Sequence, residues 1–131
     1  MPIRLLAFIS AVLLGACAAH TLPPPSGAET YGTHCASCHG PLGEGDGPVA
    51  AIMAITVPNL RTLSERNQGV FPADAVAGFI DGRDLPVSHG IRTMPVWGEV
   101  FDATTQLVPG AQPSGSRVSA IINYLRELQY R

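Results

Sequence analysis

Two cysteines and a histidine stand within five residues in the segment 35–39, which reads Cys-Ala-Ser-Cys-His. The whole chain has only three cysteines and four histidines among 131 residues, so composition alone does not account for this cluster. The same spacing is compatible with a disulfide, with half of a zinc site or with a covalently attached haem. The choice among these three determines what the rest of the chain folds around.

The N-terminal segment is predicted to be a signal for export. Arg4 is followed by an apolar run from Leu5 to Leu14 and then by small residues up to Cys17, a pattern typical of a secretory signal. The apolar run is too short to span a bilayer as a helix. The sequence Leu-Gly-Ala-Cys at 14–17 resembles a bacterial lipobox, in which the cysteine is lipidated and becomes the first residue of the mature chain.

We therefore expect a lipoprotein-type signal peptide over residues 1–16, a lipidated tether over 17–26 and one domain over 27–131. Three consecutive prolines in the tether favour an extended spacer. By resemblance to other lipoproteins, Ala18 favours the outer membrane. The expected location is the bacterial cell envelope, facing the periplasm and lipid-anchored to a membrane; cleavage near Ala19 with loss of Cys17 is the alternative.

Export places Cys35 and Cys38 in an oxidising compartment, where thiols pair with each other or are used in chemistry. Haem attachment is the interpretation that fits best. Zinc would require two more ligands, and His20, His34 and His89 form no second cluster along the chain. A redox Cys-x-x-Cys is expected beside a βαβ pattern, which is missing from this sequence. Cys-x-x-Cys-His is the haem-attachment pattern, and with Cys17 lipidated no thiol is left over in an oxidising compartment. We therefore predict one covalent haem c.

The spacing of this segment suits that chemistry. On a helix, residues three apart share one face, so Cys35 and Cys38 can both form thioether bonds along one side of a porphyrin. His39 is then directed at the ring centre, where a neutral imidazole binds iron.

Local signals predict the structure of five segments. Ser26 is a good N-cap for the helix that carries the cysteines, and residues 72–80 form a short helix capped by Gly82. Residues 117–129 form an amphipathic helix, with Tyr124 against Gly27, where glycine allows close approach. The glycine-rich segment 40–48 is a turn-rich loop without the residues of a phosphate-binding loop, and 104–117 is a surface loop with an extended stretch at 105–109.

The chain resembles small monohaem c-type cytochromes. The resemblance rests on "GAETYGTHCASCHG" at 27–40, "PNL" at 58–60, "TMPVWG" at 93–98 and "INYLREL" at 122–128. It implies an all-α cytochrome c fold, with a few short helices around one haem and the first and last helices crossing. It also implies transfer of single electrons, with a methionine before proline as the second axial ligand, which maps onto Met94.

Other residues compete with or support these ligands. Met53 lies in an apolar stretch where core packing is the default, and His34 and His89 are rival ligands for a bis-histidine haem. The resemblance nominates the Pro58 carbonyl as the acceptor for His39, with Pro48 as competitor, and Leu60 as a haem contact. Trp97 is expected to pack on the haem or in the core, and Arg83 and Arg92 either pair with propionates or are only solvated, as loop arginines commonly are.

Charge constrains the partners. Eight arginines and no lysine oppose ten acids, a net charge of −2 that argues against nucleic acid. We expect a redox protein donor and acceptor, a membrane contact through the lipid, and either a free carrier or a subunit of a larger complex. The predicted function is single-electron transfer in an exported respiratory or dehydrogenase chain, not catalysis. The alternative is a haem enzyme or gas sensor in which the sixth ligand is labile.

Overall fold

A computed structural model describes residues 23–84 and 92–130. These ranges contain helices and no strand, so the predicted all-α class is confirmed. The signal peptide, most of the tether and His89 lie outside these ranges. Among the helices that the structure describes, none has the length and hydrophobicity of a membrane-spanning segment. The elements are α1 (Gly27–His34), α2 (Ala36–His39), the 3-10 helices η1 (Ala50–Ile52) and η2 (Leu60–Thr62), α3 (Leu63–Arg66), α4 (Ala73–Asp81), α5 (Trp97–Leu107) and α6 (Ser114–Glu127).

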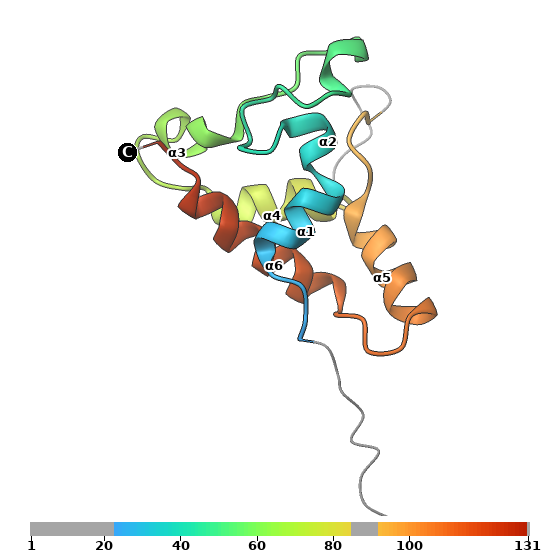
Figure 1. Ribbon diagram of the computed structural model, residues 1–131. Coiled ribbons are helices and arrows are strands. Elements are labelled where there is room, and N and C mark those ends of the chain that lie inside the picture. The colour runs from blue at the N-terminus through green and yellow to red at the C-terminus, as the bar shows by residue number, and fades with distance from the viewer. Residues whose placement is uncertain (1–22, 85–91, 131) are drawn as a thin grey trace, which may run out of the picture.

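The C-terminal helix α6 is the centre of the fold, and it packs against α1, α4 and α5 (Figure 1). The predicted apolar face of this helix is confirmed, because its four members are all buried: Val118, Ile121, Ile122 and Leu125. Tyr31 of α1, Ile80 of α4 and Phe101 of α5 complete the core against this face. Three helices from distant parts of the sequence are thereby fixed around one apolar stripe.

Helix α1 begins and crosses α6 as the sequence predicts. Ser26 accepts a hydrogen bond from the backbone of Glu29, whose carboxylate accepts one from the Ser26 backbone, which is a complete capping box. A Cβ atom on Gly27 would lie 2.1 Å from the Ala120 carbonyl oxygen and 3.0 Å from the Tyr124 Cβ. The predicted close approach of Gly27 to this part of α6 is therefore confirmed.

Helix α4 follows prediction, whereas α5 corrects one. Gly82 ends α4 in the left-handed conformation, with φ of 76°. The expected surface loop at 104–117 is shorter than predicted, because α5 continues to Leu107 and α6 starts at Ser114. The stretch predicted to be extended at 105–109 begins as helix for the same reason. Phe101, which is fully buried, draws this segment onto the core.

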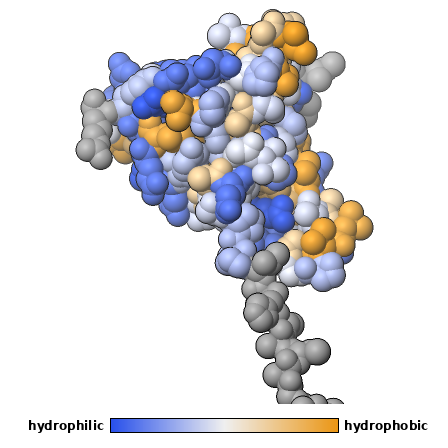
Figure 2. Space-filling view, in the orientation of Figure 1, coloured by the Kyte–Doolittle hydropathy of each residue, from blue (hydrophilic) through white to orange (hydrophobic). Residues whose placement is uncertain are grey.

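The segment between α2 and η2 extends away from the helical core and is shown at the top of Figure 1. Its first part, 40–48, contains the predicted turns. Residues 47–60 carry no charged side chain, and we call this segment the apolar lobe. Val49, Ile52 and Ile55 are exposed in it, Ile52 to 85%. Hydrophobic side chains accordingly gather over η1 in Figure 2.

Candidate functional site

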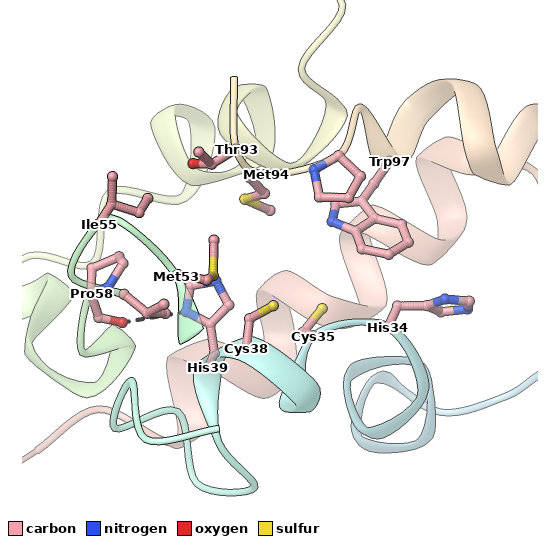
Figure 3. A pocket seen from close by; sticks show the side chains of 12 residues that line it. His34, Cys35, Cys38, His39, Met53, Ile55, Pro58, Thr93, Met94 and Trp97 are labelled. Atoms are coloured by element: carbon pink, nitrogen blue, oxygen red, sulfur yellow. Dashed lines mark hydrogen bonds between the residues drawn. The ribbon is translucent and has the colours of Figure 1, made fainter. Parts of the chain in front are cut away.

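Cys35 lies at the junction of α1 and α2, Cys38 lies within α2, and both direct their sulfurs into one cavity (Figure 3). Both are free thiols, so the disulfide interpretation does not apply to this structure. The backbone N–H groups of Cys38 and His39 both donate to the Cys35 carbonyl, at 3.2 and 2.9 Å, and this tight turn holds the three side chains together. Burial, with a smaller contribution from Cys38, raises the pKa of Cys35 to about 12, so the unmodified thiol is neutral.

His39 is oriented by the backbone of the apolar lobe. Its Nδ1 lies 3.3 Å from the Pro58 carbonyl oxygen, the contact drawn as a dashed line in Figure 3. A carbonyl only accepts, so this hydrogen bond places the proton on Nδ1 and leaves the lone pair on Nε2. Burial lowers the pKa of His39 and the bond to Pro58 opposes that shift, so the ring is neutral near pH 7. A neutral ring with a free Nε2 is the form that binds a metal.

Tyr31 supports the turn after His39, a role that the sequence did not indicate. Its hydroxyl donates to the Gly40 carbonyl at 2.7 Å, and the side chain is 1% exposed. Burial is the main reason why the pKa of this hydroxyl is raised well above its ordinary value. Tyr31 therefore links the end of α2 to the core. The spacing could have indicated this role, because an aromatic residue four positions before Cys35 lies on the same face of a helix as that cysteine.

Two adjoining cavities, of about 160 and 280 Å³, meet at this cluster. Both are bounded by Cys35, His39, Pro58 and Met94. In Figure 3, Met94 enters from the side opposite the cysteines and His39. Three further residues predicted to touch the cofactor each line one cavity: Cys38 and Trp97 line the first, and Leu60 lines the second.

The competing residues are placed differently. Pro58, rather than Pro48, provides the carbonyl beside His39. The His34 ring lies 5.2 Å from the Trp97 ring and 5.3 Å from the Phe101 ring, and Figure 3 shows it directed away from His39. Trp97 thus packs against the core as well as lining the first cavity. His89 lies outside the described residues.

The two arginines expected to pair with propionates bond to protein groups instead. Arg83 forms ion pairs with Asp81 at 2.6 Å and with Asp102 at 2.7 Å. Arg92 donates to backbone carbonyls, and neither arginine lines the cavities. Arg66 does border the second cavity, although no sequence motif pointed to it.

The linings suit a large apolar group rather than a bare metal ion. Within the described residues, no group of three or more histidine, cysteine or acidic side chains is placed to hold a metal. The side chains that sequence reasoning missed are mainly aliphatic or aromatic: Ile55 and Val57 in the first cavity and Leu63, Val76, Phe79 and Ile80 in the second. The uncharged run at 47–60 was the signal for the first two of these.

The family model described as cytochrome c oxidase, cbb3-type, subunit III matches residues 23–106, which is more than half of the chain. The chain belongs to this family. It is a c-type cytochrome domain that binds covalently attached haem c and serves haem-based electron transfer, so the predicted family and cofactor are confirmed. The match ends within α5 and leaves α6 outside it. No curated protein and no solved structure matches the chain.

The geometry of the cytochrome domain fits this cofactor. Two free thiols direct their sulfurs into the first cavity (Figure 3), a neutral imidazole presents Nε2, and a thioether faces it across an apolar space. Helix α2 supplies the imidazole together with Cys38, whereas Met94 comes from the segment before α5. Two independent parts of the chain thus contribute the candidate ligands.

Proposed function

We propose that the chain is a single-electron carrier of an exported respiratory or dehydrogenase chain, in which His39 and Met94 are the axial ligands and Cys35 and Cys38 the attachment points. When bound, the haem supplies an iron that alternates between the ferrous and ferric states. Two protein ligands leave no coordination position for a substrate. We therefore infer that the chain is not an enzyme.

The position of Met94 opposite His39 is the observation that carries this proposal. Both residues border both cavities, whereas Met53 borders only the first of these two. Met94 also packs against the core cluster, which limits its freedom to swing away. A thioether is a soft donor that favours the ferrous state, and the apolar lining excludes water, so both features raise the reduction potential.

The electron partners are expected to be redox proteins. The family description names a subunit of a cbb3-type oxidase, which supports a place in a larger complex; a free carrier is the other arrangement. The lipobox-like segment supports a lipid on Cys17 and therefore a membrane-anchored domain facing the periplasm, with the outer membrane favoured.

Replacing Met94 by alanine tests the ligand assignment. The variant should keep its covalent haem, because the segment 35–39 is unchanged, but should show a lower potential and rapid carbon monoxide binding when reduced. Peroxidase activity should also rise, because an open iron in an apolar pocket can activate peroxide. Met53→Ala is the matched control, since it removes the same side chain from the first cavity and should leave wild-type resistance to carbon monoxide.

A different outcome would contradict the assignment of Met94 as a ligand. If the wild type already binds carbon monoxide rapidly, and Met94→Ala changes neither spectrum nor potential, Met94 is a packing residue. The enzyme or sensor alternative would then lead, and His89→Ala would be the next variant to measure. Circular dichroism of each variant separates a change of ligation from loss of the helical fold.

A further inference from the structure

The segment that carries Met94 is held by a side chain rather than by secondary structure. Residues 92–96 are neither helix nor strand. Arg92 Nε donates to the Met94 carbonyl oxygen at 2.6 Å, and Arg92 Nη2 donates to the Pro95 carbonyl oxygen at 3.4 Å. The same Nη2 donates to the Phe79 carbonyl oxygen of α4. One guanidinium group therefore joins the backbone at Met94 to a neighbouring helix.

The end of α4 is a firm support for this contact. Phe79 is among the last four residues of the helix, whose carbonyls have no partner within the helix. A cation at a helix C-terminus is also favoured by the helix dipole. The adjacent Ile80 is 4% exposed and belongs to the core, so this part of α4 is fixed in place. Arginine suits the position because its planar fork can bond to several carbonyls at once.

Gly82 leaves the space that the guanidinium group occupies. A Cβ atom at this position would lie 2.7 Å from Arg92 Cζ and Nη1 and 2.8 Å from Nη2. Its φ of 76° is also the left-handed conformation that ends α4. The glycine therefore serves both the helix end and the arginine contact. Alanine here would displace the guanidinium group, which is the far end of a flexible side chain.

We propose that Arg92 is a positioning residue that keeps the Met94 thioether facing His39. This inference rests on the proposed axial ligation. Arg92 does not line either of the two cavities, so it acts through the backbone of Met94 and Pro95 rather than on the cofactor. Loss of this contact should increase the fraction of time that the thioether is away from the iron, with the covalent attachment unchanged.

Two variants test the role without removing positive charge. Arg92→Lys keeps the cation but replaces the fork by one ammonium group, and Gly82→Ala leaves Arg92 in the chain but occupies its space. Each should accelerate carbon monoxide binding to the reduced holoprotein about tenfold, the effect of losing one charge-assisted hydrogen bond. Each should also lower the potential and weaken the visible charge-transfer band of methionine-ligated ferric haem.

Gly110→Ala is the matched control for Gly82→Ala. Gly110 has φ of 79° and nothing within 4 Å of its would-be Cβ atom, so alanine brings similar backbone strain without displacing a side chain. The inference is overturned if Gly110→Ala alters carbon monoxide binding as Gly82→Ala does, because strain would then explain both. Arg92→Lys does not depend on this comparison and serves alone if Gly82→Ala does not fold.

Failure of the ligand assignment looks different from failure of this inference. If Met94→Ala opens the iron but Arg92→Lys and Gly82→Ala behave as the wild type, Met94 is the ligand and Arg92 does not position it. If Met94→Ala itself changes nothing, the proposed ligation fails and the role of Arg92 fails with it. Support requires that Met94→Ala and Arg92→Lys open the site, and that Gly82→Ala, where it folds, does so while Gly110→Ala does not.

Discussion

Replacing Gly27 by alanine should destabilise the domain, because α1 and α6 touch through their backbones at this residue. The added Cβ would lie 2.1 Å from the Ala120 carbonyl oxygen and 2.7 Å from its carbonyl carbon, whereas ordinary contact begins at 3.4 Å. The shortfall to the oxygen is 3.4 − 2.1 = 1.3 Å. Both contacted atoms are backbone, so no side chain can rotate to relieve the overlap and the two helices must separate.

The expected size of the effect follows from two opposing contributions. Overpacking a close contact costs about 1–3 kcal/mol, and separating packed surfaces also forfeits dispersion energy along the whole crossing. Alanine recovers at most about 1 kcal/mol of helix propensity, and less at the first residue of a helix. We therefore expect the free energy of unfolding to fall by about 2 kcal/mol.

Urea unfolding of the holoprotein, followed by circular dichroism, measures this change through the transition midpoint at constant slope. Gly32→Ala is the matched control, because Gly32 lies in the same helix and nothing lies within 4 Å of its would-be Cβ atom. That variant should gain about 0.5–1 kcal/mol from propensity alone. A Gly27→Ala midpoint at or above that of the wild type would refute the close crossing as the reason for glycine.

Two further predictions concern the anchor and the partner. Cys17→Ser should release a haem-containing protein from the membrane fraction into the soluble fraction; a variant that stays membrane-bound, or a wild type that is already soluble, would contradict lipidation. Electron-transfer rates should depend only weakly on ionic strength, because the apolar lobe beside the first cavity is uncharged and offers few charge pairs to steer the encounter. Stopped-flow rates across a salt series measure this dependence, and a steep fall would contradict it.

The parts of the fold that were predicted from the sequence are those with a local cause. The Ser26 N-cap, the left-handed Gly82 and the apolar periodicity of α6 each act within a few residues, and each appears in the structure. The contact between Gly27 and Tyr124 needed only two such helices and one residue without a side chain. The attachment segment is local as well, because its chemistry fits within five residues.

Helix α5 was missed because its cause is tertiary. Thr104 and Thr105 are β-branched and favour extended structure, yet their hydroxyls donate to carbonyls four residues earlier, at 2.8 and 2.9 Å. Phe101 holds the helix against α6, where Arg117 lies over its ring at 5.2 Å. Local propensity is a weak signal when a buried aromatic residue fixes the segment from outside.

The partners of the arginines lay beyond the sequence for a related reason. A solvated arginine and one that bonds three carbonyls look identical in a list of residues. The acceptors of Arg92 lie 2, 3 and 13 residues away in the chain and converge only after α4 and the Met94 segment have packed together. Only the packed structure distinguishes a charge that faces a propionate from one that holds backbone.

The two halves of the candidate site therefore differ in how they are held. On one side, His39 belongs to helix α2, follows the haem-attachment cysteine Cys38 and is hydrogen-bonded to the Pro58 carbonyl. Tyr31 anchors the following turn in the core. On the other side, Met94 lies in an irregular segment that is hydrogen-bonded to α4 through the side chain of Arg92. Local opening is easiest where few buried contacts and hydrogen bonds must break. The Met94 segment, residues 92–96, should accordingly open without unfolding the core, while the segment 35–39, with its covalently attached haem, keeps its place.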